Sequence, residues 1–407
     1  MITLRQKESA VQLQIRAEEF HDAPENLLNL APRPGNLLCW VGDKRQIVGW
    51  GEALRLEFSG RHAIREASSA WKEIADSAVG GVPIALASFA FGSHSTSYLV
   101  VPRVAIVRDN QGTRILTCAV DEEPPSPQHE VNVSREPVTA PAGLWTAPGR
   151  MTQSQWEDAV RRLIALLKSG AAAKVVLTRD MVISSATPID ERFLAQRLHD
   201  LYPTTWVYSV AGLVGATPEM LAAKRGDTVT SRVLAGTSEP GNGAELLGSL
   251  KDRSEHHFAV ESVARALSPL SDSLEVPQEP TILDLPNVTH LATDVTASIP
   301  NASVLDVIHA LHPTAAVCGT PTTLAYNILE TIEGTQRGRY SGPVGWVDGT
   351  GDGEFGIALR CGQLTDDRKS IRVFAGGGIM PDSVPAVELA ETRAKMRPVL
   401  EALQLED

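Results

Sequence analysis

The alternation of hydrophobic and polar residues changes along the chain, and each change predicts a different kind of element. Apolar residues recur at helical spacing after Thr152-x-x-Gln155, a pair typical of a capping box, and Gly170 would end that helix. Residues 252–270 and 385–405 show the same helical spacing. Shorter helices are predicted over 303–311 and 321–333.

Apolar stretches between polar turns predict strands in several parts of the chain. A hairpin is expected at Gly226-Asp227, where Gly-Asp separates two alternating stretches. Strands are predicted over residues 81–92, 98–107, 173–179, 206–214, 219–224, 228–234, 340–347, 354–364 and 370–374. Because strands follow one another in meanders and helices come separately, we expect an α+β fold of layered antiparallel sheets with helices outside.

The clearest change of composition lies at residues 121–150, where six prolines stand among Glu, Ser and Thr. We expect a surface connection there, between a sheet-rich part (residues 1–120) and a core that carries the chemistry (residues 151–407). No internal repeat is found.

Composition and charge restrict the class of protein. Lys and Arg number 37 against 49 Asp and Glu, a net charge of −12, and 43% of the residues are hydrophobic. This is the composition of a globular chain, and the acidic excess argues against nucleic acid or an anionic membrane as a partner. It also raises the question of how such a chain would bind a small anion.

The cysteines and the apolar runs indicate the compartment. Cys39, Cys118, Cys318 and Cys361 form no C-x-x-C pair, which is typical of buried thiols in a reduced protein. Residues 1–20 contain no apolar signal-peptide core, and the longest apolar stretch, 82–91, is too short to span a bilayer. We therefore expect a cytoplasmic enzyme without a membrane partner.

One apparent cofactor motif is rejected. Residues 351–356 match G-x-G-x-x-G, but the dinucleotide fingerprint needs a helix after the glycines. Here Phe355, Ile357 and Leu359 alternate as in a strand. The glycines therefore predict a hairpin turn.

Lysine and glutamate candidates each allow two interpretations. Lys174 lies inside an apolar strand and is either a general base or an edge lysine that reaches solvent. Glu255 either completes a capping box with Asp252 or faces inward as a metal ligand. On the last helix, Glu388 and Glu391 could together be ligands of Mg²⁺. Alternatively, Glu391 forms a solvated ion pair with Lys395.

Two other candidates are equally open on pattern alone. Arg360 is predicted in a strand, on the face of Glu354 and two small residues, where it would meet either a substrate carboxylate or a core acid. His256-His257 could suggest a transition-metal hydrolase site. No further His or Cys lies at ligand spacing, so a surface or supporting role is favoured.

A set of short segments follows one another along the chain: 174–179 (KVVLTR), 215–219 (GATPE), 234–237 (LAGT), 251–256 (KDRSEH), 311–314 (LHPT), 337–340 (RGRY), 342–346 (GPVGW), 353–360 (GEFGIALR), 375–379 (AGGGI) and 388–395 (ExxETxxK). In this order they resemble the chorismate-utilising enzymes, and within them the isochorismate synthases. Matching segments are frequent over residues 150–405 and rare before residue 120, where residues 87–92 are the main similarity.

The resemblance implies one integrated fold and a set of site residues. It implies Mg²⁺ as cofactor, held by Glu255, Glu388 and Glu391, with chorismate as substrate. Positions that match substrate-binding residues of the family are Thr237, His290, Tyr340, Arg360, Gly378 and Lys395.

It also implies a reaction in which water adds at C2 of the ring while the C4 hydroxyl leaves. Lys174 matches the family base and Glu219 the family acid, roles that burial would favour. The product would feed menaquinone, siderophore or salicylate synthesis.

Two positions distinguish this chain from family members that catalyse other reactions. Aminodeoxychorismate synthases carry a lysine where Ala235 stands, and anthranilate synthases lack the lysine found at 174. Salicylate synthase, which also eliminates pyruvate, and a non-catalytic chorismate-binding paralogue stay open as alternatives. Ser238 and Thr322 replace basic residues common in the family, and the sequence does not indicate an oligomeric state.

Overall fold

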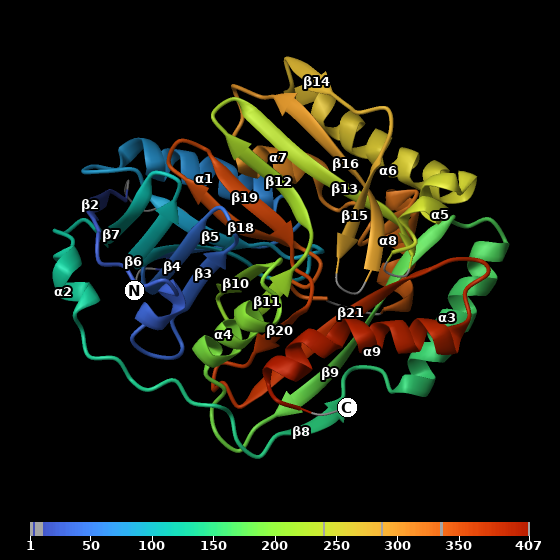
Figure 1. The fold of residues 1–407 in the computed structure, drawn as a ribbon, viewed down its shortest axis with the longest axis horizontal. Coiled ribbons are helices and arrows are strands. Elements are labelled where there is room, and N and C mark those ends of the chain that lie inside the picture. Colours follow the sequence, from blue (N-terminus) through green and yellow to red (C-terminus); the bar gives the residue numbers. More distant parts are fainter. Residues whose placement is uncertain (1–2, 5–10, 239–240, 286–287, 334–336, 406–407) are drawn as a thin grey trace.

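The computed structural model describes residues 3–4, 11–238, 241–285, 288–333 and 337–405. Within these ranges some side chains, including those of Thr237 and Glu255, lie outside the described part. The described strands pair into one network, almost wholly antiparallel, in which two arms extend from a shared trunk (Figure 1). The expected α+β class with layered antiparallel sheets is confirmed.

The trunk is formed by the N-terminal strands. Its two long strands pair along most of their length, and a bulge near Glu52 bends them. The only parallel pairing among the described strands joins a two-residue strand to the trunk. The trunk strands are β1 (Thr3–Leu4), β2 (Leu13–Glu19), β4 (Gln46–Phe58), β6 (Ser97–Asp109) and β7 (Gly112–Val120).

The first arm leaves the trunk at β4. Each strand pairs with the next in the order β3, β10, β11, β20, β21 and β9, and the far edge of β9 pairs with β8 and β17. Their bounds are β3 (Leu37–Val41), β8 (Trp145–Pro148), β9 (Lys174–Ser184), β10 (Trp206–Val210), β11 (Leu213–Thr217), β17 (Gly319–Thr320), β20 (Cys361–Leu364) and β21 (Ser370–Ile379).

The second arm leaves the trunk at β6. Pairing runs through β5, β18, β19, β12, β13 and β16, and β16 also pairs with β14 and β15. Their bounds are β5 (Ile84–Ser88), β12 (Met220–Arg225), β13 (Thr228–Ser238), β14 (Ser273–Glu275), β15 (Thr281–Leu285), β16 (Val288–Ser298), β18 (Pro343–Asp348) and β19 (Gly353–Ile357).

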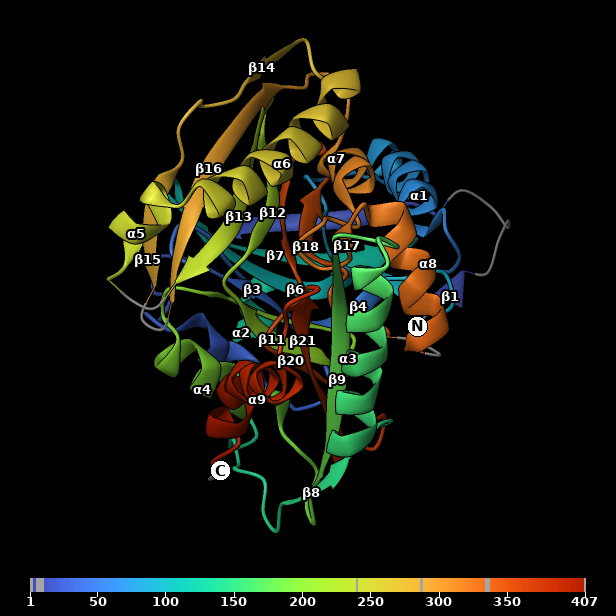
Figure 2. The ribbon, with the colours of Figure 1, turned by 90° about the vertical axis from the view of Figure 1, so that its right-hand side faces the viewer.

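Helices cover the outer faces of both arms (Figures 1 and 2). On the first arm, α9 (Pro385–Ala402) packs on β21, beside α3 (Gln153–Lys168) and α4 (Glu191–Leu201). On the second arm, α6 (Leu250–Leu267) packs on β13 and β16. The other helices are α1 (Ala63–Ser77), α2 (Pro127–Val131), α5 (Gly243–Gly248), α7 (Val304–Leu311) and α8 (Thr322–Ile332), with short 3₁₀ turns η1 (Leu27–Leu30) and η2 (Ser268–Leu270). No described helix combines the length and apolar composition needed to cross a bilayer.

Several local predictions are confirmed. Thr152 and Gln155 form a reciprocal capping box at the start of α3. Gly226 has a positive φ in the turn between β12 and β13, and Gly351 has one in the turn between β18 and β19, so the G-x-G-x-x-G segment is a hairpin. All four cysteines are buried free thiols.

Three local predictions are wrong. Residues 206–214 form two strands, because Ala211 (φ 48°) and Gly212 (φ 77°) turn the chain back. Residues 354–364 are also two strands, β19 and β20, which places Arg360 (φ 49°) between them and not on the predicted strand face. Finally, α6 is capped by Ser249, whose side chain accepts from the Asp252 backbone, so the capping box proposed for Asp252 does not form.

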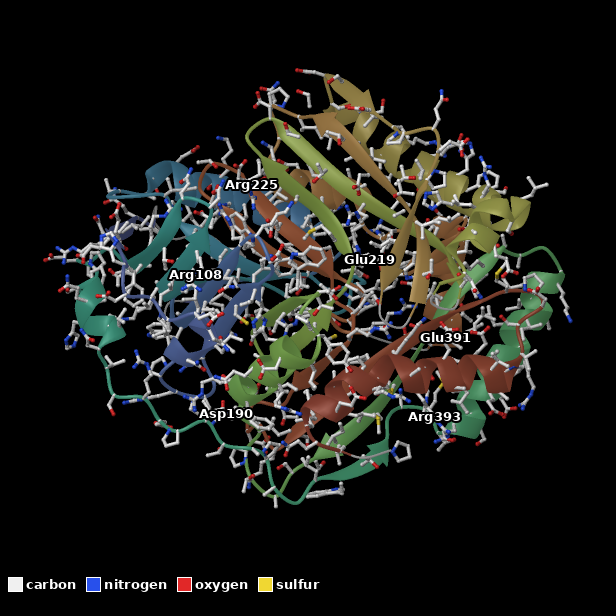
Figure 3. The ribbon with its side chains drawn as sticks, in the orientation of Figure 1. Arg108, Asp190, Glu219, Arg225, Glu391 and Arg393 are labelled. Carbon is white, nitrogen blue, oxygen red and sulfur yellow. The ribbon has the colours of Figure 1, made fainter. Side chains whose placement is uncertain are left out.

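A buried ion pair ties the Pro-rich connection to the first arm. Asp190 caps α4 and lies 2.7 Å from the guanidinium of Arg192, which is 1% exposed (Figure 3). The same guanidinium donates to the backbone oxygens of Glu136 and Pro137, inside the connection. The connection therefore packs against the first arm at this point.

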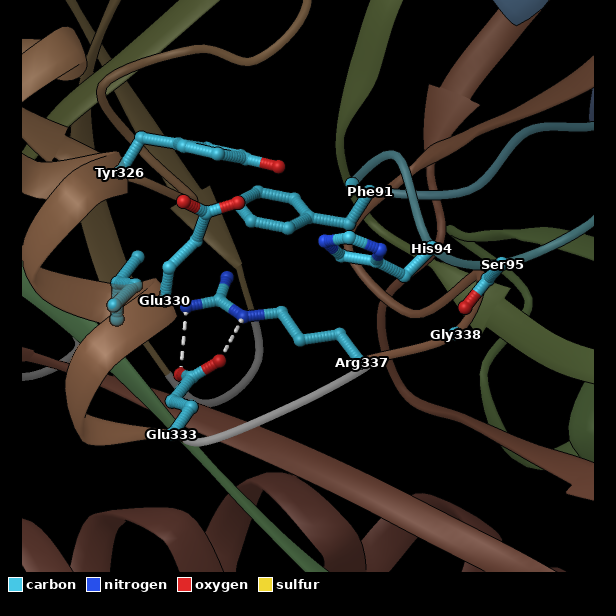
Figure 4. Close-up of a pocket in the computed structure, with 10 residues that line it drawn as sticks. Phe91, His94, Ser95, Tyr326, Glu330, Glu333, Arg337 and Gly338 are labelled. Atoms are coloured by element: carbon cyan, nitrogen blue, oxygen red, sulfur yellow. Dashed lines mark hydrogen bonds and ion pairs between the residues drawn. The ribbon is translucent and has the colours of Figure 1, made fainter. Parts of the chain in front are cut away.

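A second buried ion pair closes the exposed edge of β9 between β17 and β8. Arg337 pairs with Glu333 and donates to the carbonyl oxygens of Val317 and Val176 (Figure 4). Glu333 also accepts from the Thr178 backbone at 2.8 Å. Side chains thus complete the ladder where no strand pairs with β9.

We expect Arg337→Ala to destabilise the protein by about 3–5 kcal/mol, because the Glu333 carboxylate would stay buried without its partner. Urea unfolding checks this, with Lys72→Ala as control, since Lys72 pairs with Asp76 on the surface and its loss costs below about 1 kcal/mol. Equal midpoints for the two variants would contradict this role of Arg337.

Candidate active site

The site lies where the chain crosses between the two arms. Two of these crossings carry candidate residues: the one from β11 to β12 contains Glu219, and the one from β19 to β20 contains Arg360. The two crossings are hydrogen-bonded to each other: Ile357 N donates to Glu219 O at 3.0 Å, and Ala216 N donates to Arg360 O at 3.1 Å. Figure 3 shows Glu219 at this junction, between the arms.

A glycine allows the two crossings to lie this close. A Cβ at Gly356 would lie 2.9 Å from the backbone oxygen of Glu219 and 2.8 Å from Cγ2 of Thr217. The backbone N–H of Glu219 is itself held by the Thr217 hydroxyl at 3.2 Å. The backbone around the Glu219 carboxyl is therefore fixed from both crossings.

Burial controls the protonation of Glu219. Desolvation raises the pKa of this carboxyl to about 7, although the positive charges of Lys174, Lys395 and Arg360 oppose the rise. The cost of burying the charge thus outweighs the attraction of three cations. At neutral pH a large fraction of Glu219 carries a proton, which is the state required of an acid.

Lys174 begins β9, and it does not lie on a free sheet edge. Its backbone pairs with Thr320 of β17, and β21 pairs along the other edge of β9 from Val175 onward. The interpretation as an edge lysine is therefore wrong. Its side chain passes over Gly378, where a Cβ would lie 2.6 Å from Cε of Lys174. Glycine at 378 is what leaves room for the lysine.

Arg360 is placed to bind an anion. Its left-handed backbone (φ 49°) lies at the bend between β19 and β20, and burial lowers the pKa of its guanidinium. Among the described residues, its side chain makes no hydrogen bond or ion pair, and Tyr340, Glu391 and Glu219 act on it only through their charges. A partly buried guanidinium in this state is suited to a carboxylate ligand.

Tyr340 and Lys395 approach the same backbone of β21. Tyr340 is 4% exposed and stacks on Phe374 with ring centroids 5.3 Å apart. A Cβ at Gly376 would lie 3.3 Å from the Tyr340 hydroxyl. Lys395 donates to the Gly376 carbonyl at 3.0 Å and pairs with Glu391, so the predicted pair of Glu391 and Lys395 does form.

Glu388 has one satisfied and one unsatisfied oxygen. Its Oε1 accepts from the Ser383 hydroxyl at 2.6 Å, whereas Oε2 is buried without a hydrogen-bond partner among the described residues. Desolvation raises the pKa of Glu388, and the charge of Glu391 adds to the rise. A buried carboxylate oxygen without a hydrogen bond, close to a second carboxylate, is unfavourable in free energy. Binding of a hard cation would remove this cost.

The third predicted ligand, Glu255, lies in α6, but its side chain is outside the described part. Without it, the described residues contain no group of three His, Cys, Asp or Glu able to hold a metal. His256 is 2% exposed, with ring nitrogens 3.1 Å from Ala235 O and 2.7 Å from Thr293 Oγ1, so it locks α6 to the sheet. His257 is exposed and pairs with Glu261.

The remaining predicted residues lie on the second arm. His290 pairs in register with Thr237, beside a bulge at Gly236, and its Nδ1 lies 3.3 Å from the Gly236 oxygen. Burial lowers the pKa of His290, and Lys395 and Arg360 lower it further. The side chain of Thr237 is outside the described part.

The described site residues from both arms thus act on one another through their charges. Lys174, Lys395 and Arg360 act on Glu219, and Lys174 and Lys395 act on Glu388. The sequence prediction missed Ser383, the residue that holds Glu388. A serine shortly before a helix usually indicates an N-cap, but the N-cap of α9 is Val384, so local pattern gave no sign of this contact.

A pocket outside this group lies between α8 and the segment around Phe91 (Figure 4). It encloses about 420 Å³, and Phe91, Tyr326, Glu330 and the Arg337–Glu333 pair line it. None of the predicted site residues is among its lining. The acid with the raised pKa and the arginine that has no hydrogen bond or ion pair among the described residues lie instead at the crossings.

Comparison with known proteins identifies the family. The model of the family described as "Chorismate binding enzyme" matches residues 6–404. A "Putative isochorismate synthase MenF" of Mycobacterium tuberculosis (strain CDC 1551 / Oshkosh) is 33% identical over 402 residues, covering 94% of this chain and 99% of the relative. That match includes the N-terminal region in which the sequence motifs are thin.

Two solved structures share the fold. One is a putative 2,3-dihydroxybenzoate-specific isochorismate synthase, DhbC, from Bacillus anthracis, with TM-score 0.75, 27% identity and coverage of 92% of this chain and 98% of that one. The other is MenF, the menaquinone-specific isochorismate synthase from Escherichia coli, with TM-score 0.80, 22% identity and coverage of 97% and 95%. By fold and by family match along almost its whole length, this chain belongs to the chorismate-binding enzymes.

Proposed function

We propose that this protein is a Mg²⁺-dependent isochorismate synthase. The observation that carries the proposal is a partly buried acid, Glu219, with its pKa raised to about 7 at the junction of the arms, where the charge of Lys174 acts on it. A proton donor and a proton acceptor at one site are what an exchange of hydroxyl groups across a ring needs. The names of the relatives support the same reaction.

In the proposed reaction, the two residues handle one proton each. Lys174 accepts a proton from the water whose oxygen bonds to C2 of chorismate. Glu219 donates its proton to the C4 oxygen, which leaves as water while the ring double bonds shift. One water is added and one is lost, so the product is an isomer of the substrate.

The other residues would bind and orient the substrate. Arg360 would bind a substrate carboxylate through its fork of N–H groups, beside Tyr340. Glu388, Glu391 and Glu255 would hold Mg²⁺, for which the unpaired Oε2 of Glu388 is the supporting observation. When bound, the ion would supply positive charge for a substrate carboxylate, and Lys395, Thr237, His290 and Gly378 would complete the pocket.

Two alternatives give different products. A salicylate synthase would release salicylate and pyruvate, and a paralogue that only binds chorismate would release nothing. The acid–base pair argues against a binder, because binding alone does not require a carboxyl held near neutral pKa. Use of the product in menaquinone, siderophore or salicylate synthesis would follow from the same reaction.

We expect the purified protein to convert chorismate to isochorismate when Mg²⁺ is present, and to lose this activity in excess chelator. Chromatography of the products checks both results. Direct formation of salicylate with pyruvate would assign the lyase reaction instead. Binding of chorismate without any product would assign the paralogue.

We expect Lys174→Ala to lower kcat by at least about 100-fold, because the attacking water loses its base. Lys174→Arg should be equally impaired, since arginine keeps the positive charge but does not release its proton. Lys168→Ala at the exposed end of α3 is the control. A Lys174→Ala variant with wild-type rate and unchanged thermal unfolding would refute the base.

The raised pKa of Glu219 predicts the pH dependence. An acid must be protonated to donate, so kcat/KM should fall as pH rises through about 7, approaching tenfold per pH unit above it. Rates measured from about pH 6 to about pH 9 test this limb. A profile that keeps rising across this range would show that Glu219 does not donate the proton.

A further inference from the structure

We infer that Ser383 is the positioning residue that fixes the Glu388 carboxylate for metal binding. The inference rests on the proposed function only in taking Glu388 as a metal ligand. Ser383 lies two residues before α9 begins, outside the helix that carries Glu388. Its hydroxyl donates to Oε1 of Glu388 at 2.6 Å.

The hydroxyl of Ser383 is itself held in one orientation. Its oxygen accepts from the backbone N–H of Met380 at 3.0 Å, and the Ser383 N–H closes the turn on Met380 O at 3.1 Å. With the oxygen accepting from Met380, the hydroxyl proton is left to point at Glu388. The turn after β21 therefore determines where Oε1 lies.

Fixing Oε1 also determines where Oε2 lies. Oε2 is buried, lacks a hydrogen-bond partner among the described residues, and faces the backbone of β21. A Cβ at Gly377 would lie only 3.1 Å from it, so glycine leaves the space in front of the oxygen open. An unsatisfied buried oxygen costs free energy unless a ligand occupies that position.

The two oxygens of Glu388 therefore have different roles. Ser383 occupies Oε1 and holds the rotamer, and Oε2 stays available as a ligand. A long side chain without such a support would sample several rotamers, and metal affinity would fall accordingly. Partners of this kind typically contribute 10–100-fold to metal affinity.

The test compares Ser383→Thr with Ser383→Val, which have nearly the same shape and differ in the hydroxyl. Binding of Mn²⁺ to the substrate-free protein is measured from the free-ion signal in electron paramagnetic resonance. We expect Ser383→Thr to bind Mn²⁺ as the wild type does and Ser383→Val to bind about 10–100-fold more weakly. Ser77→Ala, which removes a serine hydroxyl bonded to Val11 O, is the control.

A second readout separates positioning from general damage. Ser383→Val should need more Mg²⁺ for half-maximal rate but recover most of its kcat at saturating Mg²⁺. If Ser383→Val does not fold, Ser383→Ala takes its place in both measurements. Equal Mn²⁺ affinity with and without the hydroxyl would overturn the inference, as would a wild-type protein that binds no Mn²⁺.

These outcomes are independent of the proposed reaction. A wild type that binds Mn²⁺ through the Ser383-dependent site but forms no isochorismate would contradict the function and leave the inference standing. If isochorismate forms but the Ser383 hydroxyl has no effect on Mn²⁺ binding, the proposed function stands and the inference about Ser383 is contradicted.

Discussion

The pair of hydrogen bonds between the two chain crossings is the constraint on which the site depends. Ile357 N to Glu219 O and Ala216 N to Arg360 O join the segments that pass from one sheet arm to the other. Each crossing continues into paired strands on both sides, so neither can shift without disturbing both arms. The acid and the arginine are therefore held by the whole sheet network.

The electrostatics of the site answer the question raised by the net charge of −12. Lys174, Lys395 and Arg360 all act on Glu219, so the junction is locally positive within an acidic chain. The charges within a partly desolvated site determine its electrostatic potential, because salt screens the more distant surface charges. Desolvation still raises the pKa of Glu219 to about 7, so this carboxyl can hold a proton beside these three groups.

Local pattern predicted much of the fold, since capping boxes and Gly-containing turns act within a few residues. It failed at two turns: Ala211 and Arg360 have positive φ although neither is Gly, Asn or Asp, and Gly212, which follows Ala211, was not predicted to turn the chain. Hydrophobic alternation continues through both positions, so each pair of strands looked like one. The break at Arg360 also changed its expected environment from a strand face to the junction.

The site itself could not have been predicted from spacing alone. Lys174 and Gly378 are far apart in sequence, and only the pairing of β9 with β21 places the lysine over the glycine. The family resemblance supplied the residues, and the fold supplies the reason for their proximity. Neither spacing nor the family resemblance indicated Ser383, because its contact with Glu388 depends on the geometry of one turn.

In the proposed reaction, water activated by Lys174 replaces a hydroxyl that Glu219 helps to leave. The most direct measurement is turnover of chorismate in oxygen-18-labelled water, followed by mass spectrometry of the product. The account predicts isochorismate with one labelled oxygen, located at C2. Isochorismate without label would contradict it, because the hydroxyl would then have moved within the substrate and not come from water.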